Sequence, residues 1–415
     1  MTVLETQALA ARHASRVLAA AGTAEKNAAL EAMAQALLER REELLSANRA
    51  DLEEARKGGM GRALLDRLTL TEERLRGIVE GVRQVAALPD PIGQVEEMRR
   101  RPNGLLIGRR RVPMGVIGII YEARPNVTVD AAVLCLKAGS AVVLRGGKEA
   151  FRSNRALTAV MRDALEGAGL PRDCVCLVED TSRASAQELM GLTEYLDLLI
   201  PRGGAGLIRS VAENARVPVI RTGEGVCHVY VDGEADLQMG AEIIFNAKCS
   251  RPSVCNAAEC LLVHRGVAEE FLPMAREFLD KKGVQLRGDR IVQDILGDCV
   301  TPAAPEDWDA EYGDYILAVR VVSGLEEAID FINEHGTGHS ECIVTRNYFH
   351  AQTFLDQVDA AAVYVNASTR FTDGFEFGLG AEIGISTQKM HARGPMGLEE
   401  ITSYKYVIYG DGQTR

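Results

Sequence analysis

Three cysteines stand within twelve residues of the segment NAKCSRPSVCNAAECLLVH, which runs from 246 to 264. Structural zinc sites commonly use four ligands in closely spaced pairs. Cys249, Cys255 and Cys260 are instead six and five positions apart, and His264 is the nearby histidine. This spacing predicts that no metal is bound. Each thiol is then either a small core residue or a nucleophile.

Cys255 has the surroundings that a reactive thiol needs. It follows Arg251 in a loop rich in turn-forming residues and precedes Asn256, where a helix could begin. A thiol near a cation and backbone N–H groups has a lowered pKa and acts as a nucleophile. A packed core cysteine is the alternative. Cys174 and Cys176 lie in an expected buried strand, so we expect both to be core residues.

Two glycine-containing turns have the form of phosphate-binding turns. PRGGAGLIRSV follows an expected strand and opens an expected helix, and RGGKEA ends another strand. Helix N-termini and strand ends of α/β proteins bind anions. Neither turn has the G-x-G-x-x-G spacing of a standard dinucleotide site, and plain tight turns with solvated charges are the alternative. The residues concerned are Gly203, Gly204, Gly206, Arg145 and Lys148.

Alternating strands and helices are expected to position these residues. Helical patterns fill 5–56 and 71–88, and a hairpin is expected at 105–114. Buried strands then alternate with helices up to a strand at 217–223, which indicates a doubly wound α/β domain with a parallel sheet. A second α/β unit begins near 227. The alternating strand at 402–409 has no obvious partner of its own.

Composition places the chain among ordinary soluble proteins. Its 415 residues exceed one compact core, so at least two domains are expected. The balance of 47 basic and 59 acidic residues, a net charge of −12, argues against nucleic-acid binding. No apolar stretch approaches the roughly 18 residues of a membrane span, and the N-terminus lacks signal-peptide features. We therefore expect a cytoplasmic protein whose nine cysteines stay reduced, with no membrane contact.

Together these stretches resemble the aldehyde dehydrogenase superfamily, and within it the gamma-glutamyl phosphate reductase (glutamate-5-semialdehyde dehydrogenase) family. GAEIGIST followed by HARGPMGL is the most specific part of the match. The other matching stretches run in family order from about residue 105 to the end: VPMGVIGIIYEARPNVTVDAA, SAVVLRGGKEA, IPRGGAGLI, RPSVCNAAECLLVH, TGHSECIVT, VYVNASTRFTDGFEF and EEITSYKYVIYG.

The resemblance implies an α/β fold with a Rossmann-type cofactor domain, an α/β catalytic domain and a β oligomerisation arm. The arm would explain the partnerless strand, because an unpaired edge invites pairing between chains. A homo-oligomer, either a dimer or a dimer of dimers, is therefore expected. The expected ranges are 1–98, 115–225 and 364–394 for the NADP-binding domain with its N-terminal helices, 226–363 for the catalytic domain, and 99–114 and 395–415 for the arm.

The resemblance also assigns roles to individual residues. It places Cys255 in the nucleophile position, Asn126 as the amide that holds the oxyanion, and Glu311 as the ligand of the nicotinamide ribose. Where many relatives have a lysine followed by a carboxylate, this chain has Arg145 and Lys148, which favours a 2′-phosphate and hence NADP(H). Candidates for substrate recognition are Asn366, Ser368 and Thr369.

One departure from the superfamily is informative. Ordinary aldehyde dehydrogenases hydrolyse their thioester with a glutamate base, and this chain has Thr222, within RTGEG, in that position. An acyl-phosphate reductase needs no such base, because phosphate leaves when the thiolate attacks. The resemblance thus implies NADPH-dependent reduction of L-glutamyl 5-phosphate to L-glutamate 5-semialdehyde, the second step of proline biosynthesis, with glutamate 5-kinase as a candidate partner. Glu224 keeps a hydrolytic enzyme open, and a CoA-acylating aldehyde dehydrogenase and a non-enzymatic scaffold are further alternatives.

Overall fold

The structure is a computed structural model that describes residues 1–415, apart from the side chains at positions 62, 63 and 205. The chain forms two compact units. Unit 1 comprises 1–222, 378–384 and 396–415, and unit 2 comprises 223–377 and 385–395. Each unit contains a parallel sheet, in agreement with the two α/β units expected from the sequence.

Unit 1 opens with helices that the alanine- and leucine-rich sequence favours. A capping box starts α1: the Thr2 hydroxyl accepts from the Glu5 N–H at 3.1 Å, and the Glu5 carboxylate accepts from the Thr2 N–H at 2.7 Å. The helices are α1 (Val3–Ala20), α2 (Thr23–Glu39), α3 (Arg41–Lys57), α4 (Arg62–Leu68) and α5 (Glu72–Ala87).

The sheet of unit 1 has the order β5-β4-β3-β6, and every pairing in it is parallel. The strands are β3 (Val116–Tyr121), β4 (Ala141–Arg145), β5 (Val175–Leu177) and β6 (Leu198–Arg202), and they are joined by α6 (Pro125–Lys137), α7 (Phe151–Gly167), α8 (Arg183–Gly191) and α9 (Ala205–Asn214). Apolar residues of α1, α8 and α9 pack on one face. Cys174 and Cys176 are buried, as predicted, and burial raises the pKa of each thiol to about 12.

The predicted strand at 217–223 is wrong. Only Val219 forms an isolated bridge, with Leu199 of β6. The Leu199 N–H donates to the Pro218 carbonyl at 2.8 Å, and the Ile220 N–H donates to the Leu199 carbonyl at 3.1 Å. A longer ladder is disfavoured here because proline has no N–H to donate.

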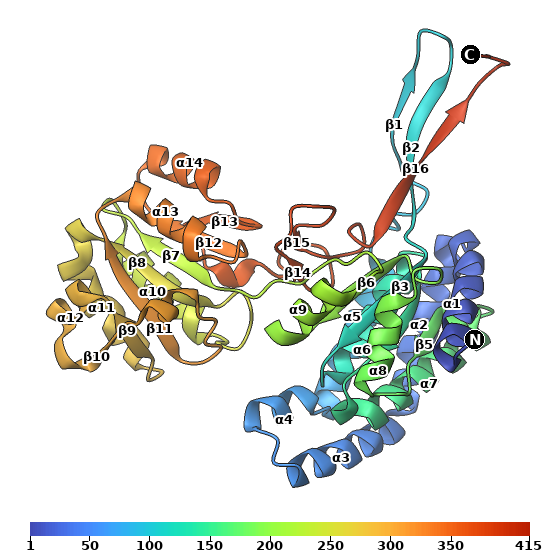
Figure 1. Cartoon of the computed structure of the whole chain (residues 1–415), viewed down its shortest axis with the longest axis horizontal. Helices are drawn as coiled ribbons and strands as arrows, with labels where there is room; N and C mark the ends of the chain where they lie inside the picture. Colours follow the sequence, from blue (N-terminus) through green and yellow to red (C-terminus); the bar gives the residue numbers. More distant parts are fainter. The chain divides into compact units, whose positions relative to one another are not determined.

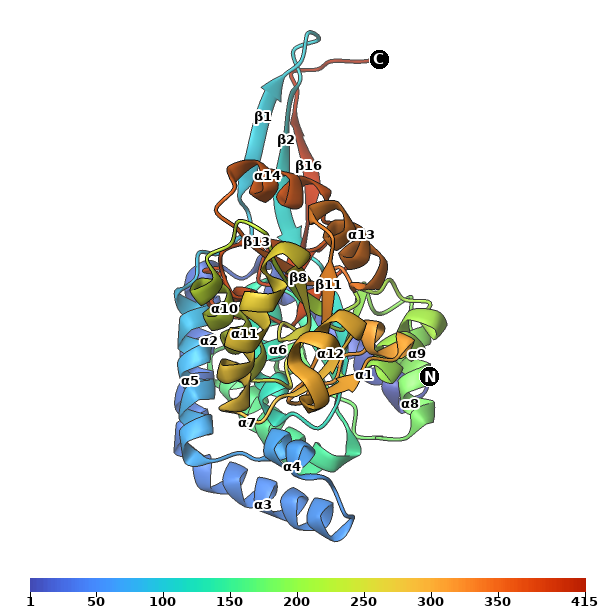
Figure 2. The same cartoon turned by 90° about the vertical axis from the view of Figure 1, so that its left-hand side faces the viewer.

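A three-stranded antiparallel sheet forms the arm of unit 1. It consists of β1 (Val95–Arg100), β2 (Leu106–Pro113) and β16 (Thr402–Tyr409), in the order β1-β2-β16. Both views show it projecting beyond the helices of unit 1 (Figure 1 and Figure 2). The strand at 402–409 therefore has a partner within its own chain, contrary to the sequence expectation: β16 pairs with β2 along its full length, from Thr402 opposite Pro113 to Tyr409 opposite Leu106.

Unit 2 contains a seven-stranded parallel sheet with the order β10-β9-β11-β8-β7-β12-β13. Its strands are β7 (Cys227–Val231), β8 (Ala258–His264), β9 (Gln285–Gly288), β10 (Val300–Pro302), β11 (Ile316–Val322), β12 (Ser340–Val344) and β13 (Ala362–Val365). The short strands β14 (Ile385–Ser386) and β15 (Gly394–Pro395) pair with each other.

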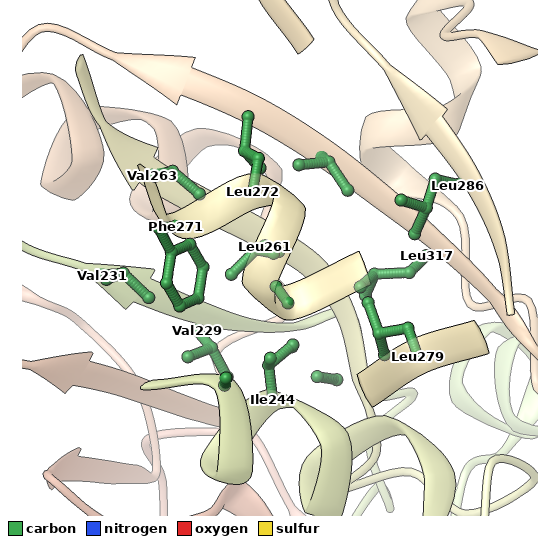
Figure 3. Packing of buried hydrophobic residues seen from close by; sticks show 14 of the residues in the cluster. Val229, Val231, Ile244, Leu261, Val263, Phe271, Leu272, Leu279, Leu286 and Leu317 are labelled. Carbon is green, nitrogen blue, oxygen red and sulfur yellow. The ribbon is translucent and has the colours of Figure 1, made fainter. Parts of the chain in front are cut away.

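Helices cover both faces of this sheet. Residues of α10 (Leu237–Cys249), α11 (Ala268–Asp280) and α12 (Arg290–Leu296) form one core with the sheet, in which Phe271 packs near Val231 (Figure 3). Residues of α13 (Leu325–His335) and α14 (Tyr348–Gln357) form the other. Continuous burial on both faces explains why the strands read as unbroken apolar runs.

The unit boundaries differ from those expected. The expected range 364–394 of the cofactor domain falls mainly in unit 2, because β13 is hydrogen-bonded to β12 and β14 to β15. Of this range, 378–384 belongs to unit 1. Among the helices described, none combines the length and apolarity that crossing a bilayer requires.

Candidate active site

Cys255 lies on the turn between α10 and β8, and its side chain is partly exposed. The turn is closely packed from below. A Cβ atom at Gly225 would overlap the carbonyl oxygen of Cys255, so only glycine fits there. The Cys227 thiol donates to the same carbonyl at 3.2 Å. These contacts fix the main chain of the cysteine and leave its side chain on the accessible side.

Asn256 fixes the other end of the turn. Its buried side chain donates through Nδ2 to the Thr372 carbonyl at 2.9 Å, and its own carbonyl accepts from the Thr369 hydroxyl at 2.7 Å. Ser368 caps the short 3₁₀ helix η6 (Thr369–Phe371) by accepting from the Arg370 N–H at 3.3 Å. Ser368 and Thr369, expected from the sequence as substrate ligands, are both buried within the network that supports Cys255.

Asn366 is placed differently. It has a positive φ of 57°, and its amide is used twice by one residue at the end of β12. Its Oδ1 accepts from the Thr345 N–H at 2.9 Å, and its Nδ2 donates to the Thr345 carbonyl at 2.9 Å. The side chain therefore ties β13 to β12.

Arg370 is a site residue that the sequence reading missed, although it directly follows two of the chosen candidates. Burial lowers the pKa of its guanidinium, and the charge of Arg251 lowers the pKa further. The thiols of Cys255 and Cys227 act in the opposite direction, so they lie close enough to interact with this cation. The reciprocal effect stabilises a thiolate at Cys255.

The other two cysteines of the opening segment are core residues. Cys249 and Cys260 are buried, and burial raises the pKa of the Cys249 thiol to about 11. Cys227 is also buried, and burial raises its pKa well above the usual range. Cys255 is thus the accessible thiol of this cluster, as a nucleophile must be. In the described part of the chain no group of acidic, histidine or cysteine side chains is arranged to hold a metal.

Glu311 is exposed and anchored near the turn. Its carboxylate accepts from the Gly225 N–H at 3.2 Å. The same loop is held by Glu259, which accepts from the Gly313 N–H at 3.2 Å and pairs with the buried Lys248 at 2.5 Å. Burial raises the pKa of Glu259 to about 7 and lowers that of Lys248.

The expected cofactor turns both lie in unit 1. Glu122 accepts from the Gly204 N–H at 2.9 Å, and a Cβ at Gly203 would lie 2.6 Å from the Glu122 carboxyl carbon, so Gly203 permits this approach. A Cβ at Gly206 would meet nothing within 4 Å. That position therefore imposes no steric need for glycine.

Arg145 and Lys148 stand at the carboxyl end of β4. One nitrogen of Arg145, Nη2, donates to the carbonyls of Thr181 at 2.7 Å and Ser182 at 2.8 Å. Its Nε is buried and has no hydrogen-bond partner among the described residues, and Lys148 is exposed. An unpaired buried donor beside an exposed cation at a strand end fits an anionic cofactor group.

Asn126 and Thr222 belong to unit 1, whereas Cys255 belongs to unit 2. Asn126 is exposed in the first turn of α6 and donates to Asp130 at 3.0 Å; burial raises the pKa of Asp130 to about 6. The buried Thr222 hydroxyl donates to the Pro201 carbonyl at 3.0 Å. A neutral, hydrogen-bonded hydroxyl cannot replace the hydrolytic carboxylate. Glu224, in unit 2, is half-buried.

Two parallel-sheet units, one with phosphate-type turns and one with an accessible cysteine, describe an aldehyde dehydrogenase. The sequence model of the aldehyde dehydrogenase family matches residues 2–290 and 311–407, and the chain belongs to this family. It is therefore an oxidoreductase, and enzymes of this family use nicotinamide cofactors.

The most similar relatives narrow the comparison. The chain is 60% identical over 405 residues to the gamma-glutamyl phosphate reductase of Carboxydothermus hydrogenoformans, covering 98% of this chain and 97% of the relative. The protein of that name from Halothermothrix orenii is 57% identical over 409 residues, covering 99% and 98%. The crystal structure of the Thermotoga maritima gamma-glutamyl phosphate reductase is 50% identical, with a TM-score of 0.97 over 100% of both chains.

More distant structures share the fold. An engineered glycolyl-CoA reductase with bound NADP⁺ is 16% identical, with a TM-score of 0.70 over 98% of this chain and 96% of that chain. The family resemblance read from the sequence is confirmed.

Proposed function

We propose that this enzyme reduces L-glutamyl 5-phosphate to L-glutamate 5-semialdehyde and phosphate with NADPH, the second step of proline biosynthesis from glutamate. The observation that carries the proposal is the accessible Cys255 on a turn held by Gly225 and Asn256. Relatives 57% and 60% identical over nearly the whole chain bear the name of this activity, which supports the choice of substrate.

In the proposed mechanism the Cys255 thiolate attacks the γ-carbonyl carbon. A sulfur–carbon bond forms, the carbon–oxygen bond to phosphate breaks, and phosphate leaves with the electron pair. Splitting the displacement in two is what a covalent nucleophile contributes. Backbone N–H groups and the Asn126 amide are our candidates for holding the oxyanion. The cation of Arg370 favours the attacking thiolate and the departing thiolate alike.

NADPH supplies the hydride that reduces the thioester. We infer that Arg145 and Lys148 hold its 2′-phosphate, because the first offers an unpaired buried N–H and the second an exposed ammonium group. We assign the backbone at Gly203 and Gly204 to its phosphates, with Gly206 nearby, and Glu311 to its nicotinamide ribose. Lys148→Glu should therefore weaken NADPH binding, measured by fluorescence titration, more than NADH binding.

A CoA-acylating enzyme is the second candidate, because it too needs no hydrolytic base and Thr222 supplies none. The two functions separate in one assay. With glutamate semialdehyde and NADP⁺, our proposal requires inorganic phosphate as the acyl acceptor, whereas the alternative requires CoA. Turnover without either acceptor would indicate hydrolysis, with Glu224 as its candidate base.

The nucleophile is tested in the same assay. Cys255→Ser should lower phosphate-dependent NADPH formation by about 10⁴-fold or more while the protein stays folded. Cys299→Ser is the matched control, because Cys299 is exposed and outside the site. If the Cys255 variant turned over at a near-normal rate, Cys255 would not be the nucleophile.

We also propose a cytoplasmic homo-oligomer that associates through the arm. Tyr404, Tyr406, Ile408 and Tyr409 of β16 are exposed, an unusual density of large apolar side chains for a free strand. Glutamate 5-kinase, which makes the acyl phosphate, remains our candidate for a physical partner.

A further inference from the structure

Arg370 spans the turn that carries the nucleophile. Its Nε donates to the Ser250 hydroxyl at 3.1 Å, and its Nη1 donates to Oδ1 of Asn256. Ser250 opens the turn, and Asn256 directly follows Cys255. Because the guanidinium is tied to both ends of the turn, it is held beside the reacting thiol.

The two cations of this turn lack the partners that arginines elsewhere in unit 2 possess. Arg287, for example, pairs with Asp307 at 2.5 Å. No carboxylate of the described residues lies within 4.0 Å of a side-chain nitrogen of Arg251 or Arg370. Asp373 is the acidic residue whose charge reaches Arg370.

Arg251 adds a second cation to the same turn. Its side chain is exposed, and its charge lowers the pKa of the Arg370 guanidinium beyond the effect of burial. Holding two like charges together beside a nucleophile costs free energy, and an anion bound between them offsets that cost. The pair is therefore a site for an anionic group.

We propose that Arg251 and Arg370 form a phosphoryl-binding subsite beside Cys255, which receives the leaving group of the acyl phosphate and, in the reverse reaction, inorganic phosphate. This inference rests on the proposed function. The phosphoryl group is bonded through one oxygen to the carbon that sulfur attacks, so cations on the cysteine's own turn can reach it. The α-carboxylate, the other anion of the substrate, lies at the far end of the carbon chain.

Guanidinium groups suit this role because their planar fork of donors matches phosphate oxygens. As the sulfur–carbon bond forms, the carbon–oxygen bond breaks and its electron pair moves onto the phosphate oxygen. The two cations stabilise this growing charge, and in the reverse direction they bind phosphate for attack on the thioester. No oxidant or further reactant enters this step.

The kinetic test uses Arg251→Gln, Arg370→Lys and Arg370→Gln in the full-length enzyme. With semialdehyde and NADP⁺ saturating, each should raise the KM for phosphate about tenfold, with the KM for semialdehyde changing less than about threefold. Arg290→Gln is the control: its exposed ion pair with Asp294 lies on α12, and it should change neither constant. A rise confined to the KM for semialdehyde would assign the pair to the α-carboxylate and overturn the proposal.

A second test needs neither cofactor nor turnover. In a Cys299→Ser background, Cys255 is alkylated with anionic iodoacetate or neutral iodoacetamide, and the products are mapped by mass spectrometry. The ratio of the two rates should fall about fivefold or more in Arg251→Gln and Arg370→Gln, and inorganic phosphate should slow iodoacetate in the parent. Arg251 is exposed, so its variant should fold even if Arg370→Gln does not.

The two proposals fail in different ways. An enzyme that turned over without phosphate would refute the proposed function, whereas the alkylation ratio would still report the anion site. An unchanged ratio with no protection by phosphate would refute the subsite, whatever the acyl acceptor of the wild-type enzyme.

Discussion

At the scale of single residues, the position of Cys255 depends on side chains that other residues do not have. Gly225 is buried, and its main chain occupies the space beside the cysteine carbonyl that any Cβ would fill. The carbonyl is then fixed by the Cys227 thiol. Because a thiolate must approach the carbonyl carbon of its substrate along a narrow path, small shifts of this turn affect the rate more than substrate binding.

Gly225→Ala should consequently lower kcat by about 100-fold, because the turn must move away from the new methyl group. The KM for semialdehyde should change far less. Gly77→Ala is the control: Gly77 is exposed on α5, and a Cβ there meets nothing within 4 Å. Steady-state kinetics of both variants check this, and a Gly225→Ala enzyme with unchanged kcat would contradict the account of the turn.

His228 supports a pH-dependent stability of unit 2. The buried His228 donates through its N–H and its Nδ1 to the Glu341 carboxylate, at 2.7 and 2.9 Å. Burial alone lowers the pKa of His228, but the charge of Glu341 outweighs it and raises the pKa to about 10. Since an unfolded histidine titrates near 6.5, the folded state holds the extra proton between these values.

The stabilisation from His228 should therefore be complete below about pH 6.5 and be lost as the pH rises towards 10. Trp308, the one tryptophan of the chain, packs against Phe331 at 5.6 Å, and Phe331 contacts the His228 ring. Its fluorescence therefore follows urea unfolding of unit 2. The double variant His228→Gln/Glu341→Gln should lose most of this pH slope, and an unchanged slope would contradict the assignment.

At the scale of elements, η6 supports the cysteine turn from a distant part of the chain. Thr369→Val removes the hydrogen bond to the buried Asn256 carbonyl and should lower kcat about tenfold with little change in KM. Thr369→Ser keeps the hydroxyl and should behave like the wild type. If KM rose instead, Thr369 would be a substrate ligand, as the resemblance to the family first implied.

Most elements and the family could be predicted from the sequence, because helical periodicity and buried apolar runs are local signals. The nucleophile was accessible for the same reason, since Cys255 sits among turn-forming residues. Long-range partners left no local signal. The pairing of β16 with β2, the bridge from Arg370 to Ser250 and Asn256, and the contact of Gly225 with Cys255 all join residues far apart in the sequence.

At the scale of the whole molecule, the arm has one strand edge still available. β2 lies between β1 and β16, so the outer edge of β16 has no strand partner in the part of the chain described. Tyr406 and Ile408 are 61% and 58% exposed and point to the same face, since alternate residues of a strand share a face. A second copy of this chain would bury both the edge and these side chains.

Tyr406→Lys/Ile408→Lys should therefore shift the oligomer towards smaller species, because charged residues on an edge strand oppose strand addition. Sedimentation velocity over a range of protein concentrations measures the shift. Lys405→Gln, which changes charge on the opposite face of the same strand, should leave the sedimentation coefficient unchanged. Trp308 fluorescence should be unaffected in both variants, because the arm belongs to unit 1 and Trp308 to unit 2. If the double variant sedimented like the wild type, assembly through this arm would be wrong.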